Sequence, residues 1–183
     1  MRSIYKSEGI KIDLREIKGT RIRAAYFCED GRFSVLVNKK LPQAPRLFCL
    51  AHELKHHYLD RDKIRDGTIK CGDYNQNKEI EIAAEIFAAE FIYPVAEMVE
   101  LIQDMGINKS NCTPEELVKF KKKCPAKVSY QFLVKRFEWL RLCQKGEYKS
   151  IQFNKLEEKI YGKPFYKEKW FKEHRAKKSS HSK

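Results

Sequence analysis

The chain lacks the features that would place it outside the cytoplasm or across a membrane. No apolar run approaches the roughly 20 residues that a membrane-spanning helix needs. The N-terminal stretch MRSIYKSEGIKIDL has no apolar core of the kind found in a signal peptide. None of the six cysteines forms a CxxC pair, and their spacing indicates neither a disulfide framework nor a four-thiolate zinc site. We therefore expect a cytoplasmic protein with reduced cysteines.

Hydrophobic residues make up 42% of the sequence and aromatic residues 12%, a composition typical of a folded protein. A length of 183 residues suits one domain, with room for a small appendage. The formal net charge of +13 is compatible with binding to nucleic acid, with an acidic partner, or with an ordinary soluble basic protein. Charge alone therefore does not choose a function.

The N-terminal part of the chain predicts a hairpin followed by a helix. Residues 21–40 hold two apolar runs on either side of Asp30-Gly31, a pair that favours a tight turn. The two prolines within residues 41–45 end the second strand. From Arg46 the apolar residues recur with helical spacing. The positions that share one face of this helix are Leu47, Leu50, Leu54 and Tyr58.

The remainder predicts mostly helices. Residues 60–77 are polar and contain two glycines, so we expect a loop, and residues 78–94 form an Ala-rich helix that ends at a proline. A further helix should end at Gly106. Thr113-Pro114-Glu115-Glu116 has the form of a capping box with proline at the first helical position, and Ser129 is placed to cap another helix.

Three of the five histidines lie within residues 52–57, where His52-Glu53-Leu54-Lys55-His56 forms an HExxH pentapeptide. On a helix, residues i and i+4 share a face, so both imidazoles can bind one zinc ion at about 2.0–2.1 Å. Glu53 lies about 100° further round the helix, where its carboxylate can take a proton from water at the metal. With 5 His and 18 Glu, random order gives on the order of one such pattern per hundred chains of this length. His57 lies off the ligand face, so we expect it to support the site from behind or to lie at the surface.

A catalytic zinc site needs a third protein ligand and an open position for water. The histidines outside the cluster lie in the basic C-terminal tail, so a carboxylate within residues 78–94 is the better source. Glu81 and Glu85 share a face with Ala84 and Ala88, where small side chains let another helix approach closely. This reasoning leaves Glu81 and Glu85 as equal candidates.

The segments CLAHELKHHYL and EIEIAAEIFAAEFIYP resemble the ImmA/IrrE family of zinc metallopeptidases. The family pattern is an HELGH helix, a loop, and a helix in which a glutamate precedes F-A-A. When the chain is aligned on Phe87-Ala88-Ala89, that glutamate is Glu81. The resemblance therefore implies that His52, His56 and Glu81 bind zinc and that Glu53 is the general base.

The resemblance covers residues from about 10 to about 145. It implies an α+β fold, in which a small N-terminal β-hairpin or sheet packs on a zincin-like helical core and a mainly helical C-terminal part follows. We expect the metallopeptidase core over residues 1–106, a helical extension over 107–145 that could be winged-helix-like, and a basic segment over 146–183 whose end is disordered.

Three positions depart from the family pattern. Lys55 replaces the usual glycine, Glu85 stands where asparagine or aspartate is common, and IYP replaces LMP. None of these changes removes a proposed ligand, but Glu85 adds a second carboxylate close to the site. The donor that would polarise a substrate carbonyl is not identified, and the candidates for it are Tyr58, Tyr74 and Tyr93.

Members of this family often act on a helix-turn-helix repressor of a phage or mobile element, so the resemblance implies a cytoplasmic zinc endopeptidase with such a protein substrate. One alternative is a nucleic-acid-binding regulator, in which exposed Lys135, Arg136 and Arg141 contact phosphate. We favour the simpler interpretation that the helices bearing them pack on the rest of the protein. The other alternative is a partner-binding module with a structural zinc, which would need a fourth protein ligand such as Glu85.

Overall fold

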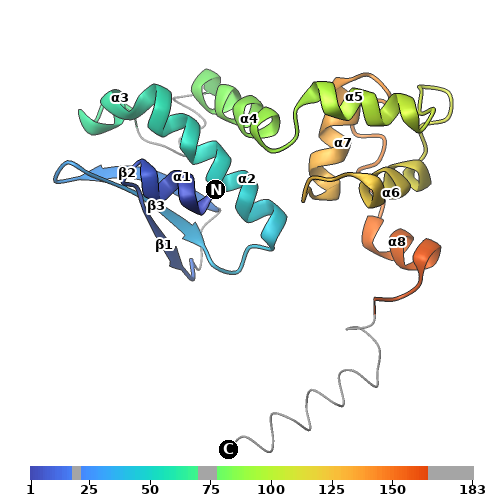
Figure 1. Cartoon of the computed structure of the whole chain (residues 1–183), viewed down its shortest axis with the longest axis horizontal. Helices are drawn as coiled ribbons and strands as arrows, with labels where there is room; N and C mark the ends of the chain where they lie inside the picture. The colour runs from blue at the N-terminus through green and yellow to red at the C-terminus, as the bar shows by residue number, and fades with distance from the viewer. Residues whose placement is uncertain (18–21, 70–77, 165–183) are drawn as a thin grey trace, which may run out of the picture. The chain divides into compact units, whose positions relative to one another are not determined.

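The computed structural model describes residues 1–17, 22–69 and 78–164. The chain divides into two compact units, each considered by itself below: residues 1–101 with 125–132, and residues 102–124 with 133–183. The helices and strands are labelled in Figure 1. The domain boundaries expected after residues 106 and 145 stay predictions.

The first unit contains a three-stranded sheet, which confirms the α+β class (Figure 1). Strands β2 (Ala24–Glu29) and β3 (Arg32–Asn38) form the expected antiparallel hairpin, with Glu29 opposite Arg32. Asp30 and Gly31 make the turn with φ of 49° and 73°, the positive values that this dipeptide adopts readily. The sequence did not reveal β1 (Lys11–Arg15), which pairs in parallel with β3 and leaves β2 at the other edge of the sheet.

Helix α2 (Gln43–Lys55) carries the HExxH segment except for its last residue, His56, which follows directly, and the helix begins three residues earlier than the sequence predicted. Pro45 does not prevent this early start because the first backbone N–H groups of a helix have no partner within it. Leu50 and Leu54 are buried, as their spacing predicted. Arg46 holds the preceding turn by donating to the backbone oxygens of Lys39 and Leu41, at 2.6 and 2.8 Å.

The prediction of a loop over residues 60–77 is wrong for its first part. Helix α2 continues into a π-helical turn, η1 (His56–Asp60), and then into α3 (Arg61–Arg65). Ile64 anchors α3 in the core, which the polar residues around it obscured. The wide turn of a π-helix also changes which side chains share a face, so Tyr58 is exposed and not aligned with Leu54. Residues 70–77 of the expected loop lie outside the described residues.

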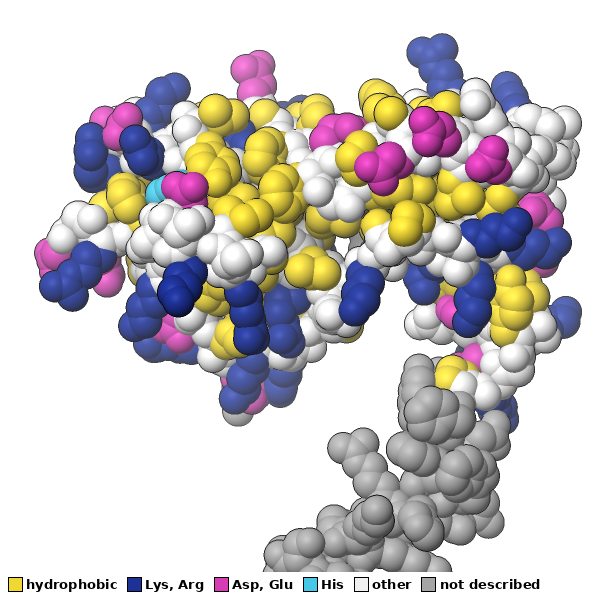
Figure 2. Space-filling model, in the orientation of Figure 1, with side chains coloured by type: hydrophobic (Ala, Val, Ile, Leu, Met, Phe, Trp, Pro, Cys, Tyr) yellow, Lys and Arg dark blue, Asp and Glu magenta, His cyan; other side chains and the backbone are white. Residues whose placement is uncertain are grey.

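Helix α4 (Lys78–Ile92) packs against α2. Ala84 and Ala88 are fully buried, as expected of small residues where two helices meet closely. The opposite side of α4 exposes Ile82 and Ile86, so this helix is hydrophobic most of the way round, as the sequence predicted. Figure 2 accordingly shows hydrophobic side chains gathered on the face where Figure 1 draws α2 and α4.

The core of the first unit lies between the sheet and α2. Val35 and Val37 from β3 are fully buried and pack in one cluster with Leu54. The short helix α1 (Arg2–Ser7) closes this cluster, because the buried Tyr5 donates its hydroxyl to the backbone oxygen of Leu50 at 2.7 Å. The sheet and α1 thus hold the helix that carries the histidines.

The helices beyond α4 have the predicted signals at their ends. Helix α5 (Val95–Asp104) stops before Gly106, whose φ is 63°. Helix α6 (Pro114–Lys123) is capped by Thr113, which accepts the N–H of Glu116 at 3.3 Å.

Helix α7 (Tyr130–Trp139) is capped by Ser129, which accepts the N–H of Phe132 at 3.1 Å. Helix α8 (Phe153–Tyr161) was not predicted. It lies in the basic segment expected over residues 146–183, for which no helix was predicted, and Phe153 is the residue that it buries. The end expected to fray, residues 166–183, lies outside the described residues. None of the described helices has both the length and the hydropathy that a membrane crossing requires.

The different burial of two leucines in this helical segment predicts how their replacement affects stability. Leu54→Ala should lower the free energy of unfolding by about 2–5 kcal/mol, because it removes a fully buried side chain from the core. Leu59→Ala should change it by no more than about 0.5 kcal/mol, because Leu59 within the π-helical turn is 68% exposed. Urea titrations of both variants measure the difference, and equal losses would contradict the helical register described here.

Candidate metal centre

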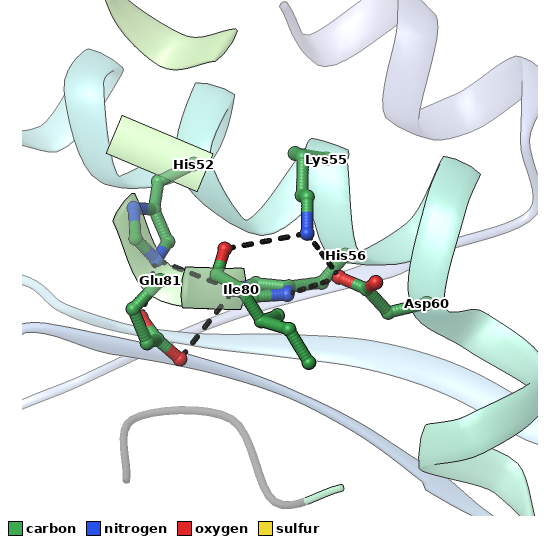
Figure 3. Close-up of polar contacts among 6 residues, drawn as sticks. All are labelled: His52, Lys55, His56, Asp60, Ile80 and Glu81. Carbon is green, nitrogen blue, oxygen red and sulfur yellow. Dashed lines mark hydrogen bonds and ion pairs between the residues drawn. The ribbon is translucent and has the colours of Figure 1, made fainter. Parts of the chain in front are cut away.

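Three side chains that the sequence singled out converge at the contact between α2 and α4 (Figure 3). His52 Nε2 lies 3.0 Å from Glu81 Oε2 and 3.3 Å from His56 Nε2. His56 Nε2 lies 3.7 Å from Glu81 Oε1. One ligand atom of each residue lies within 4.8 Å of the other two, so the group could hold a metal ion.

The spacing of these atoms suits a tetrahedral ion. Bonds of about 2.0 Å at tetrahedral angles place neighbouring ligand atoms about 3.3 Å apart. The three distances of 3.0, 3.3 and 3.7 Å bracket that value. His56 and Glu81 are almost fully buried, whereas 13% of the His52 side chain is exposed. The donor set is therefore preformed, with one of its members open to solvent.

The structure distinguishes between the two carboxylates that the sequence left equal. Glu81 is 1% exposed and belongs to the group with the two histidines. Glu85 is half-buried one turn further along α4 and is not part of that group. Within the described part of the chain, the ligand set thus contains three residues. A role for Glu85 near the site stays a prediction.

Glu53 lies next to this group and is 5% exposed. A backbone hydrogen bond from Tyr26 on β2 holds its carboxylate, while Oε2 is buried without a hydrogen-bond partner. Burial is the main reason that the pKa of Glu53 rises to about 7, with Glu81 raising it further and His52 opposing the change. A carboxyl group with this pKa can both accept and return a proton near neutral pH.

Sequence reasoning missed Asp60, which lies behind the ligand His56 in the π-helical turn (Figure 3). The Nδ1 atom of His56 is 2.8 Å from Asp60 Oδ2. Lys55 Nζ donates to the same carboxylate oxygen at 2.7 Å and to the backbone oxygen of Ile80 at 3.3 Å. The signal in the sequence was an aspartate four residues beyond a candidate metal ligand, inside a segment assigned to a loop. Burial lowers the pKa of His56, although its hydrogen bond to Asp60 opposes the change.

His57 is buried and points toward the sheet. Its Nδ1 atom is 2.8 Å from the hydroxyl of Tyr26, and its ring packs edge-on against Phe33. Its Nε2 atom is 3.6 Å from a carboxylate oxygen of Glu8. The alternative that His57 lies at the surface is therefore wrong, because it is 2% exposed and packs against the sheet. Its supporting role stays a prediction, and the contacts described here connect it to β2.

The three tyrosines considered as carbonyl-polarising donors differ in position. Tyr58 is exposed and donates to Glu8 at 3.1 Å. Tyr93 is buried after α4 and donates to the backbone oxygen of Glu97 at 3.3 Å. Tyr74 lies outside the described residues. The donor therefore remains unassigned.

The basic residues considered for nucleic-acid binding are not equally exposed. Arg136 is 8% exposed, so the expectation that it faces solvent is wrong. Its guanidinium lies 5.4 Å from the centroid of the Trp139 ring, a cation–π contact that accounts for its position. Lys135 and Arg141 are exposed. On the face drawn in Figure 2, Lys and Arg side chains are spread among hydrophobic and acidic ones, and binding to nucleic acid stays a prediction.

The raised pKa of Glu53 predicts a pH-dependent stability of the metal-free protein. The folded state holds this proton up to about pH 7, whereas the unfolded chain releases it near 4.5. The folded state is therefore favoured at low pH, and this contribution is lost as the pH rises through 7. Glu53→Gln does not titrate, so its melting temperature relative to the wild type should rise between about pH 5 and about pH 8. Thermal unfolding of both proteins after chelation tests this, and a difference that does not change with pH would contradict it.

Comparison with family models assigns this site to a known class. Residues 6–138 match the model described as IrrE N-terminal-like domain, Peptidase M78. The match spans the sheet, both helices of the candidate metal centre, and the helices up to α7. No curated protein sequence matches the chain. The chain belongs to the IrrE N-terminal-like family of metallopeptidases, as the resemblance of its two helices predicted.

Proposed function

We propose that this protein is a zinc-dependent endopeptidase of the ImmA/IrrE type that cleaves a specific protein partner. The observation that carries the proposal is the placement of Glu53 beside His52, His56 and Glu81. A buried carboxylate oxygen without a hydrogen-bond partner, next to three converging metal ligands, is poorly explained as a structural feature. It is well explained as a proton acceptor for water.

Zinc is the metal that this donor set suits best. Two imidazoles and one carboxylate match the ligands of catalytic zinc sites, which keep a fourth position open. His52, His56 and Glu81 would hold the ion. When bound, zinc would act as a Lewis acid that polarises the peptide carbonyl and lowers the pKa of water. A structural zinc would need a fourth protein ligand, and the group in the described residues supplies three.

Glu53 would move the protons of the reaction. Its unpartnered Oε2 takes a proton from the attacking water, and the carboxylic acid so formed gives that proton to the amine that leaves. A pKa of about 7 makes both transfers accessible near neutral pH. The hydrogen bond from Tyr26 fixes the rest of the carboxylate, so the free oxygen keeps its direction.

The edge strand β2 supports a peptide as the substrate. The Asn38 N–H donates to the Arg23 oxygen, and hydrogen-bonded pairs alternate along antiparallel strands. The even-numbered residues of β2, Tyr26 among them, therefore direct their backbone groups away from β3, in agreement with the bond from Tyr26 to Glu53. An extended peptide can add to such an edge by main-chain hydrogen bonds.

We further propose that the partner is a helix-turn-helix transcriptional repressor of a phage or mobile element, and that cleavage relieves repression. The resemblance to the ImmA/IrrE family supports this choice. The decisive test incubates the protein with the repressor encoded beside its gene, with and without a chelator, and maps any cut by mass spectrometry. Cleavage that persists after chelation would contradict a metal-dependent mechanism.

The ligand assignment predicts which variants lose metal. Glu81→Gln and His56→Ala should each lose zinc, because each removes one of three ligands from the group. Glu79→Gln changes an exposed glutamate of the same helix, so it is the matched control and should keep a full equivalent. Metal content after dialysis, measured by mass spectrometry, gives the answer, and an equivalent of zinc retained by Glu81→Gln would overturn the ligand set.

The assignment of the base predicts a variant that binds metal without cleaving. Glu53→Gln should keep its zinc, because Glu53 is not a ligand, and should cut the repressor at least about a hundredfold more slowly. The same dialysed samples serve for a timed cleavage assay, with Glu79→Gln again as the control. Wild-type rates from Glu53→Gln would remove Glu53 from the mechanism.

A further inference from the structure

Lys55 is unusual because its side chain is only 5% exposed. A buried ammonium group is costly unless it is paired and hydrogen-bonded. Here the ammonium donates to Asp60 at 2.7 Å and to the backbone oxygen of Ile80 at 3.3 Å. Both acceptors adjoin the candidate metal centre (Figure 3). The position of Lys55 therefore calls for an explanation in terms of that centre.

The π-helical turn brings Lys55 and Asp60 together. In a regular α-helix, residues five apart point in different directions, whereas the turn of a π-helix closes between residues i and i+5. Asp60 thus comes to lie between Lys55 and His56, and its Oδ2 atom receives a contact from each. One carboxylate oxygen is shared by an ammonium group and by the ring of a metal ligand.

The second contact of Lys55 reaches the other helix of the site. Ile80 directly precedes the ligand Glu81 in the first turn of α4. The backbone oxygen of Ile80 accepts from Lys55, which belongs to α2. The ammonium group thus connects the helix that carries both histidines to the residue next to the third ligand.

We propose that Lys55 is a positioning residue of the metal centre. It fixes Asp60 so that Nδ1 of His56 donates to that carboxylate and Nε2 is left to bind metal, and it ties Glu81 to the two histidines through Ile80. The inference rests on the proposed function, since it takes His52, His56 and Glu81 as the ligands. It explains why a lysine is stable where the family pattern has glycine.

A measurement on the unaltered protein tests the first part. Long-range ¹H–¹⁵N correlation of the histidine rings identifies which nitrogen of His56 carries the proton. In the metal-free protein at neutral pH, and again with zinc bound, the proton should be on Nδ1, which faces Asp60. A proton on Nε2 in the metal-free protein would overturn the proposal, whatever the variants do.

Zinc affinity tests both contacts of Lys55 together. Competition with a chromogenic chelator should show zinc binding by Lys55→Met weakened by about 10–100-fold, the usual effect of removing a group that orients a metal ligand. Lys63→Met, which removes an exposed lysine nearby, is the matched control and should bind zinc as the wild type does. The visible spectrum of bound Co²⁺ should also change in Lys55→Met, because it reports the ligand geometry.

A double-mutant cycle separates positioning from general destabilisation. If Lys55 acts largely through Asp60, then Lys55→Met in an Asp60→Ala background should weaken zinc binding by less than about threefold. The proposal would be overturned if Lys55→Met weakened zinc binding as much in the Asp60→Ala background as in the wild type. It would also be overturned by a Lys55→Met protein with wild-type zinc affinity and cobalt spectrum. Wild-type protein that binds no zinc would instead overturn the proposed function. The two failures are therefore distinguishable.

Discussion

The close contact between α2 and α4 is the interaction on which the rest of the site depends. Ala84 and Ala88 have side chains small enough to let the helices approach, and both are fully buried in this contact. Glu81 lies on the same face of α4, so the approach buries its carboxylate against His52 and His56. A larger residue at either alanine position would separate the helices, and the third ligand would move away from the other two.

The charges buried around this contact favour a divalent cation. Among the described residues, Glu53, Asp60 and Glu81 contribute three buried carboxylates, and Lys55 contributes one buried ammonium group. With neutral imidazoles, three negative charges and one positive charge leave a net charge of about −2, which one divalent ion balances. Without the ion, part of this imbalance is relieved by the proton that Glu53 keeps up to about pH 7. Burial and charge thus agree with the geometry of the ligand atoms.

The sequence predicted the parts of this site that depend on local spacing. The pairing of His52 with His56 follows from the helical repeat, and the hairpin follows from Asp30-Gly31. Glu81 required the family resemblance, because Glu85 occupies an equivalent position by spacing alone. In the sequence, Lys55 was only a departure from the family pattern. Its contact with a backbone oxygen of another helix can be seen only in the folded structure.

The π-helical turn could not be predicted, because a sequence pattern assumes one helical period along the whole segment. Past His56 that period changes, so Tyr58 is exposed, although on an α-helix it would share the buried face of Leu54. The same change brings Asp60 within reach of Lys55, five residues before it. Strand β1 was missed for a different reason. Its partner β3 lies more than 15 residues away in sequence and runs parallel to it, so no tight turn of the kind that marks a hairpin joins the two strands.

The two consecutive histidines of the π-helical turn contact different parts of the protein. His56 faces the ligand group and Asp60, whereas His57 faces the hydroxyl of Tyr26 on β2. Tyr26 also holds Glu53 through its backbone N–H, so one strand residue contacts both the helix segment after the ligands and the proposed base. Two connections therefore fix the position of Glu53 relative to His52 and His56: the helical segment that carries all three residues, and the contacts of Tyr26 on β2. A displacement of β2 would move Glu53 relative to His52 and His56, which makes the edge strand part of the geometry of the site as well as a surface for a peptide.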